Sequence, residues 1–204
     1  MSNIWVTSDL HLGHANVIKY SERPFADVEA MNAGLIAGWN ERVNKKDRVY
    51  LLGDVFFGRV ATQDHLLDQL NGVITLVTGN HDKGLVKRLT KSGHNRFVEI
   101  TPYYELHDGK ELFVLCHYPM VFWNKSHYGT TMLHGHSHGG LDEENLRANV
   151  RRLDVGVDCH GYKPINLDEV RAILKDRVAA RHHRGPNDPR NEIGQTDTDH
   201  SDSE

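Results

Sequence analysis

Apolar positions in the first half of the chain follow two alternating spacings. Three short, continuous apolar runs predict buried strands, and three stretches with apolar residues at helical spacing predict helices. Asp27 stands directly before the first of these helices, where an N-cap is expected. The pattern therefore predicts a βαβαβα unit. In chain order its elements are strand 4–6, helix 28–43, strand 49–52, helix 61–70, strand 73–77 and helix 82–91.

The second half of the chain predicts more strands and fewer helices. Asp108-Gly109 favours a tight turn, and the two strands beside it are expected to form a hairpin. A loop rich in aromatic and polar residues follows. We expect mainly antiparallel strands here, continuing the same α/β domain. The expected elements are strands 97–106 and 111–116, loop 117–128, strands 130–133 and 152–157, and a helix 167–180 capped near Asn166.

Composition limits the organisation of the chain and its partners. Its 204 residues, 38% of them hydrophobic, suit a single domain over residues 1–181. Residues 182–204 are polar and end in acidic residues, so they bury too little apolar surface to order themselves, and we expect a disordered tail. The formal net charge of -4 gives no support for binding to long nucleic acid.

The N-terminus and the cysteines indicate the setting of the chain. No basic region followed by a long apolar segment is present, and no apolar run approaches the roughly 20 residues of a membrane span. Cys116 and Cys159 lie in apolar runs and form neither a disulfide framework nor a CxxC site. We therefore expect reduced thiols, no membrane association and a cytoplasmic location.

Residues that can bind metals directly follow the predicted strands, and the fifteen histidines of the chain supply most of them. Ligands gather at the carboxyl ends of strands in open α/β sheets, so these side chains are expected to converge on one pocket. In chain order they are Asp9, His11, Asp54, Asn80, His81, His117, His136 and His138.

The residue types favour a particular class of metal. Carboxylate, imidazole and amide oxygen together suit Mn, Fe, Zn or Ni, whereas an all-oxygen set would indicate Ca or Mg and a thiolate set structural zinc. Seven ligands exceed what one tetrahedral ion needs and fit two ions that share a carboxylate. Two divalent ions beside two carboxylates also leave an excess positive charge, which suits a phosphodiester anion.

Five segments, in this order, resemble the motifs of the calcineurin-like metallophosphoesterase superfamily, and the resemblance covers about residues 4–165. The stretch SDLHLGHANVIKYSERPF is similar to the small members found in phages and bacteria. The resemblance implies an α/β fold of four layers, with two packed mixed β-sheets flanked by helices. The five segments are Ser8-Asp9-Leu10-His11, Leu52-Gly53-Asp54, Thr78-Gly79-Asn80-His81-Asp82, Cys116-His117-Tyr118-Pro119 and His134-Gly135-His136-Ser137-His138.

The resemblance also implies a role for each matching residue. His81 would stand beside the phosphate and help the leaving group depart, and Asp82 would orient His81. Asp54 would bridge two metals. The other ligands divide into Asp9, His11 and His138 for the first metal, and Asn80, His117 and His136 for the second.

Candidates for substrate contact are less specific. Arg59 is expected to meet a phosphate oxygen through its planar guanidinium, with a solvated loop arginine as the alternative. His14 is expected to contact substrate or to support the ligands. The loop between His117 and His136 offers further residues for the rim of a substrate pocket, Asn124, His127 and Tyr128. The basic positions of helix 82–91 form either a solvated face or an electrostatic rim.

These observations predict a hydrolase of phosphoric esters that uses two divalent cations, Mn²⁺ first, with Fe, Zn or Ni as alternatives. The expected substrate is a small or nucleotide-like phosphodiester, cleaved through a metal-bridging hydroxide. A phosphomonoesterase acting on a nucleotide or phosphoprotein is the first alternative. A non-catalytic scaffold with the same fold is less favoured, because it predicts eroded ligand positions and none is missing here.

Overall fold

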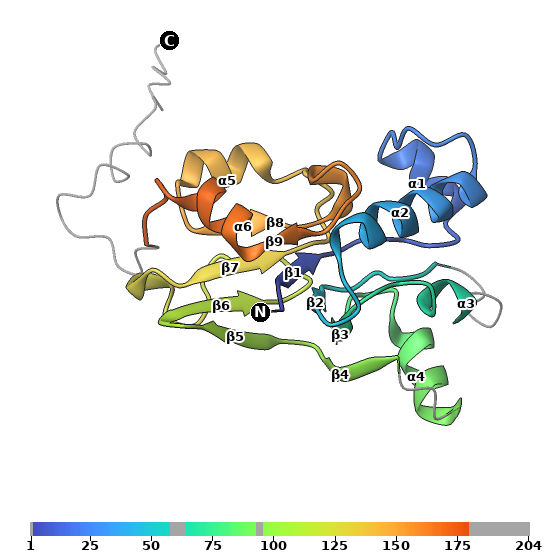
Figure 1. Ribbon diagram of the computed structural model, residues 1–204. Helices are drawn as coiled ribbons and strands as arrows, with labels where there is room; N and C mark the ends of the chain where they lie inside the picture. The colour runs from blue at the N-terminus through green and yellow to red at the C-terminus, as the bar shows by residue number, and fades with distance from the viewer. Residues whose placement is uncertain (1, 58–63, 93–95, 180–204) are drawn as a thin grey trace, which may run out of the picture.

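A computed structural model describes residues 2–57, 64–92 and 96–179 of the chain (Figure 1). The expected tail, residues 182–204, lies outside these ranges. The first of two sheets has the strand order β4-β3-β2-β1-β9. Strands β1 to β4 are parallel to one another, and β9 pairs antiparallel with β1. Its strands are β1 Ile4–Thr7, β2 Arg48–Leu51, β3 Val73–Val77, β4 Phe97–Thr101 and β9 Ile165–Asn166.

The second sheet has the strand order β5-β6-β7-β8. Strands β5 and β6 form the expected hairpin, but β6, β7 and β8 are parallel, so the expectation of mainly antiparallel strands is wrong. Long connections join β6 to β7 and β7 to β8, and such connections permit the parallel arrangement. The strands are β5 Tyr104–Asp108, β6 Glu111–Leu115, β7 Thr131–His134 and β8 Arg152–Asp154.

The single strand expected over 97–106 is two strands in different sheets. The break falls at Pro102, which has no N–H to donate to a ladder. Before it β4 pairs with β3, and after it β5 pairs with β6. The chain thus crosses from the first sheet to the second at this proline.

The helices agree with the sequence in their caps more than in their lengths. The Asp27 side chain accepts from the Ala30 N–H at the start of α2, and Asn166 forms a capping box with Glu169 at the start of α6. Helices α3 and α6 end earlier than expected, and α1 and α5 were not expected. The helices are α1 Ala15–Tyr20, α2 Val28–Arg42, α3 Asp64–Leu67, α4 Lys83–Ser92, α5 Asp142–Ala148 and α6 Leu167–Leu174. No helix among the described residues is long and apolar enough to cross a membrane.

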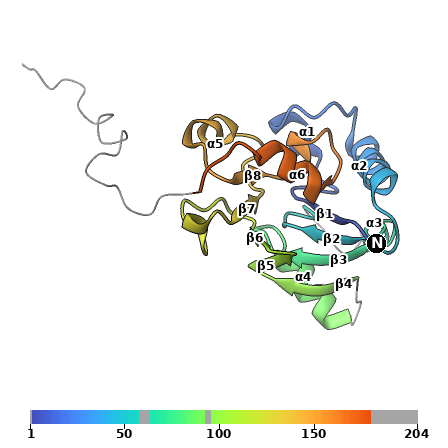
Figure 2. The ribbon, with the colours of Figure 1, turned by 60° about the vertical axis from the view of Figure 1, so that its left-hand side comes forward.

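Alternate residues of the first sheet face two different cores. Val6, Tyr50 and Leu52 pack against the second sheet and α6, while Trp5, Val49 and Leu51 pack against helices on the other face. In Figure 2 the strands of the second sheet lie to the left of those of the first. The expected architecture of two packed mixed sheets flanked by helices is therefore confirmed.

Candidate metal centre

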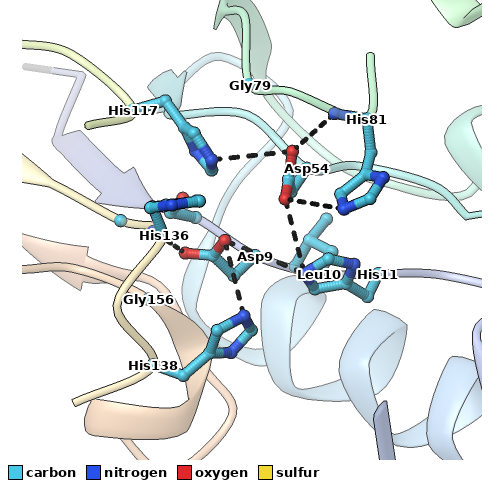
Figure 3. A network of polar contacts seen from close by, with 12 residues as sticks. Asp9, Leu10, His11, Asp54, Gly79, His81, His117, His136, His138 and Gly156 are labelled. Atoms are coloured by element: carbon cyan, nitrogen blue, oxygen red, sulfur yellow. Dashed lines mark hydrogen bonds and ion pairs between the residues drawn. The ribbon is translucent and has the colours of Figure 1, made fainter. Parts of the chain in front are cut away.

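The expected ligands meet where the two sheets come together. The Asp9 N–H donates to the Gly53 carbonyl, which joins the loops after β1 and β2, and Ser8 forms a bridge with Gly156 beside the second sheet. The Gly135 N–H donates to the His117 carbonyl, which joins the loops after β6 and β7. Figure 3 shows the resulting ring of side chains around Asp9 and Asp54.

Six of the seven expected ligands form two clusters, in each of which the potential ligand atoms lie within 4.8 Å of one another. Cluster one is Asp9, His11 and His138, and cluster two is Asp54, His117 and His136. Asp54 lies between them: its Oδ2 is 3.6 Å from His11 Nε2, and its Oδ1 is 3.6 Å from His117 Nε2. The arrangement matches the expected shared carboxylate.

Hydrogen bonds orient two of the imidazoles. His117 Nδ1 lies 2.8 Å from the Leu52 carbonyl, and His138 Nδ1 lies 2.7 Å from Asp158 Oδ2. Because both partners are acceptors, each Nδ1 carries the proton and each Nε2 offers a lone pair to the site. Asn80, the seventh expected ligand, places its Oδ1 3.0 Å from His117 Nε2. Because His117 Nε2 and Asn80 Oδ1 are both acceptors, their short separation suits a cation bound by both.

Buried polar atoms without partners indicate that a group is needed here. Asp9 Oδ1 and both ring nitrogens of His11 are buried and have no hydrogen-bond partner. An unsatisfied buried polar group costs about 1–3 kcal/mol. The donor set of carboxylate and imidazole suits a divalent transition metal, which would satisfy these atoms.

Backbone conformation concentrates strain at the same place. Of the nine non-glycine residues with positive φ in the described part of the chain, five are expected ligands. Such conformations cost about 1–3 kcal/mol each, and they cluster at functional sites. The five are Asp9 (φ 59), His11 (φ 50), Asp54 (φ 53), His136 (φ 68) and His138 (φ 46).

Two glycines of the expected motifs allow this close approach. A Cβ on Gly79 would lie 2.3 Å from Asp54 Oδ1, and a Cβ on Gly135 would lie 2.4 Å from Asp9 Oδ2. Any side chain at either position would therefore displace a ligand carboxylate.

Comparison with known proteins finds relatives of this chain in an archaeon and in a phage. No family model matches the chain. The uncharacterised protein MJ1445 of Methanocaldococcus jannaschii is 37% identical over 183 residues, which cover 87% of this chain and 95% of that protein. The gene 66 protein of Mycobacterium phage D29 is 31% identical over 203 residues, covering 86% of this chain and 98% of that protein.

A solved structure of a protein of unknown function, AQ665 from Aquifex aeolicus, matches with a TM-score of 0.67 and 21% identity, covering 85% of this chain and all of that one. The fold is thus shared, and the five motifs, in the expected order, bring their side chains to one site. The chain belongs to one family with MJ1445 and the gene 66 protein of phage D29, which it matches over more than two thirds of its length. These relatives in an archaeon and a phage match over nearly their whole lengths.

An ion network that the sequence did not reveal supports cluster one. The Arg23 side chain is fully buried, and its Nε lies 2.7 Å from Asp158 Oδ1. It also donates to the carbonyls of Asp9 and Leu10. Asp158 in turn accepts from His138. Arg23 lies in the SERPF stretch, but nothing in the sequence pairs it with a carboxylate 135 positions away.

The pKa values of cluster one reflect its burial. Burial raises the pKa of Asp9 to about 6 and lowers the pKa of His11 to about 2. The hydrogen bond to Asp158 raises the pKa of His138. Burial also acts to raise the pKa of Asp158, but hydrogen bonds from His138 and Arg23 hold it below its usual value. The metal-free cluster therefore favours a protonated Asp9 below about pH 6.

His81 lies at the edge of the site. Its side chain is 36% exposed, and its Nε2 is 3.8 Å from Asp54 Oδ2. The His81 N–H donates to Asp54 Oδ1, which fixes the backbone of this residue against the shared carboxylate. The imidazole thus faces both solvent and the region between the clusters.

Asp82 has a role different from the expected one. Its carboxylate accepts from the backbone N–H groups of Asp54, Val55 and Gly79, at 2.9, 3.0 and 2.7 Å. The expectation that it orients His81 is wrong, because both oxygens face the backbone. Asp82 instead holds the loop that presents Asp54.

The residues predicted to contact substrate lie in different parts of the structure. His14 stacks on Phe57 with ring centroids 3.8 Å apart, and its ring lies 5.4 Å from that of His11. Arg59 lies outside the described residues. Asn124 donates to Glu105 on β5, and Tyr128 lines a cavity of about 370 Å³ with β5 and β6 residues. His127 packs on Tyr128, so these three loop residues lie away from the clusters.

Proposed function

We propose that the chain is a phosphoesterase that uses two divalent transition-metal cations and cleaves small phosphodiesters. The observation that carries the proposal is the pair of three-ligand clusters with the Asp54 carboxylate between them. A structural site would need one closed shell, whereas two adjacent clusters at an exposed edge fit a catalytic pair.

The residues present fit the cations. Cluster one would hold one cation, and His117, His136 and Asn80 would hold the other, with Asp54 serving both. When bound, the two cations would supply activation of the attacking water and neutralise charge on the phosphoryl oxygens. Mn²⁺ is the first candidate, and the mixed donor set also suits Fe, Zn or Ni.

His81 is suited to protonate the leaving oxygen. Its imidazole is partly exposed and lies beside Asp54, so a substrate bound over the clusters would meet it. Histidine titrates near neutral pH and commonly serves as a general acid. The hydrogen bond from the His81 backbone N–H to the Asp54 carboxylate fixes the position of His81 relative to this ligand.

The charge of the described site supports a diester over a monoester. Arg23 contacts the backbone of Asp9 and Leu10 in the described site, but it is buried and bonded to Asp158 and these two carbonyls. It is therefore not free to neutralise the second negative charge of a monoester. A singly charged diester needs no such partner.

Reconstitution tests the proposal. The chain is stripped with a chelator and titrated with Mn²⁺, and hydrolysis of bis-p-nitrophenyl phosphate and p-nitrophenyl phosphate is measured. We expect turnover only with metal, and faster turnover of the diester. His81→Ala should bind the same amount of Mn²⁺ and turn over more slowly, while His107→Ala, an exposed histidine on β5, should match the parent protein. No turnover with Mn, Ni, Co or Zn in a folded protein would overturn the proposal.

A further inference from the structure

Exposed aromatic side chains gather around the metal centre. Among the described residues, five Phe and Tyr side chains are exposed, and three of them are in ring contact with histidines of the site. Aromatic rings are usually buried, because each removes a large apolar area from water. Exposed apolar surface grouped at one place marks a binding surface. The three are Tyr20, Phe57 and Tyr118.

Phe57 lies beside cluster one and the candidate proton donor. It is 38% exposed, and its ring centroid is 5.0 Å from that of His81. His14 covers part of the ring, and Tyr20 packs against His14 from further out. The backbone of Phe57 is fixed by a hydrogen bond from its N–H to the Leu12 carbonyl. The backbone of Phe57 is thus fixed, and part of its ring is accessible to solvent beside His81.

Tyr118 lies beside cluster two. It is 45% exposed, and its ring centroid is 5.0 Å from that of His117 and 4.9 Å from that of His136. In Figure 3 these two histidines lie to the left of the carboxylates, and His81 and His11 lie to the right. The two aromatic rings therefore flank the clusters from different sides.

Rings on both sides of a phosphate site suit a substrate with a flat group on each side of its phosphorus. Nucleobases stack on aromatic side chains, and each such contact changes affinity by about 5- to 150-fold. The chain carries a net charge of -4, which favours a short substrate over a long polyanion.

We propose that the site takes a phosphodiester that joins two nucleosides, with one base against Phe57 and the other against Tyr118. This inference rests on the proposed function. Because Phe57 contacts His81, the base on Phe57 belongs to the leaving nucleoside. Water adds to phosphorus, the bond from phosphorus to the leaving oxygen breaks, and His81 protonates that oxygen. The products are a nucleotide monoester and a nucleoside.

A substrate series with matched variants tests the inference in the Mn²⁺-loaded full chain. The substrates are thymidylyl-thymidine and two analogues, each with one base replaced by an abasic residue. Product analysis identifies the leaving side. The variants are Phe57→Leu and Tyr118→Leu, with Tyr128→Leu as the control, because Tyr128 is exposed at the other end of the second sheet.

We expect Phe57→Leu to raise KM at least about fivefold for the intact substrate and to leave KM within about twofold for the analogue without the leaving base. Tyr118→Leu should show the reciprocal pattern. Phe57→Tyr, which keeps a stacking ring, should restore the parent KM, and Tyr128→Leu should change nothing. In each case KM should change more than kcat, which distinguishes lost stacking from a disturbed metal centre.

Three results would contradict the inference. Equal KM for all three substrates, with normal turnover, would overturn it and leave the proposed function intact. Sensitivity to the leaving base alone would overturn the role of Tyr118. No turnover of these substrates or of bis-p-nitrophenyl phosphate would overturn the proposed function itself.

Discussion

The two ligand clusters differ in how the chain holds them. Cluster one is buried except for the half-buried His138 and is supported by side-chain charges, with Arg23 and Asp158 linking His138 to the backbone of Asp9. Cluster two includes the exposed His136 and is supported through the backbone, where Asp82 holds the loop of Asp54. From this comparison we expect cluster one to be the tighter cation site and cluster two to be the more open one, where a substrate has room to bind.

Asp54 belongs to cluster two and also lies beside His11 of cluster one, so replacing it should weaken both clusters. We expect Asp54→Asn to lower metal affinity at both clusters and to reduce kcat/KM by roughly 10³-fold, the effect of losing one partner of a buried charge group. Mn²⁺ titration and steady-state kinetics measure the two effects. Loss of binding at one cluster alone would show that Asp54 is not shared.

Asp158 should act on cluster one alone. Asp158→Asn removes the charge that fixes the His138 imidazole, and loss of such a support costs about 10- to 100-fold in metal affinity. Titration should show one weakened site and one unchanged site. Asp168→Asn, a change at an exposed residue paired with Arg171, is the matched control. Equal weakening of both sites would contradict the separate support of cluster one.

Competition between protons and the cation should make the affinities of the two clusters depend differently on pH. Burial raises the pKa of Asp9 to about 6, and the pKa of His138 is also raised, so a cation entering cluster one displaces protons as the pH falls. Affinity at cluster one should fall about tenfold per pH unit below about pH 6, and more steeply where both protons are displaced. Burial lowers the pKa of His136, so protons compete less for that ligand of cluster two. Titrations at about pH 5 and about pH 8 measure this. An equal loss of cation affinity at both clusters would contradict this prediction.

Asp82 should affect the fold more than the chemistry. Asp82→Asn keeps one accepting oxygen but leaves fewer acceptors for three backbone N–H groups, so the free energy of unfolding should fall by about 1 kcal/mol. Urea denaturation of the metal-free chain measures it, with Asp168→Asn again as the control. Unchanged stability together with a slower His81-dependent step would contradict this role of Asp82.

Local patterns in the sequence predicted the elements of the first half and the residues that gather at the site, whereas the two-sheet architecture was implied by the family resemblance. Short apolar runs place β1 to β3, Asp27 and Asn166 mark helix starts, and the ligands follow strands directly. Contacts between distant segments were not predictable in this way. Strand direction in the second sheet is one case.

The supports of the two clusters are the other case. Arg23 and Asp158 are 135 positions apart, and nothing local marks them as partners. The three backbone acceptor contacts of Asp82 also depend on how two loops meet. Side-chain identity therefore revealed which residues gather, and only the fold revealed what holds them.

The central claim is that two cations bind side by side around Asp54. Anomalous diffraction from crystals grown with Mn²⁺ tests it most directly. We predict two anomalous peaks, one among Asp9, His11 and His138 and one among Asn80, His117 and His136, both adjacent to the Asp54 carboxylate. A single peak, or a second peak that does not contact Asp54, would contradict the account.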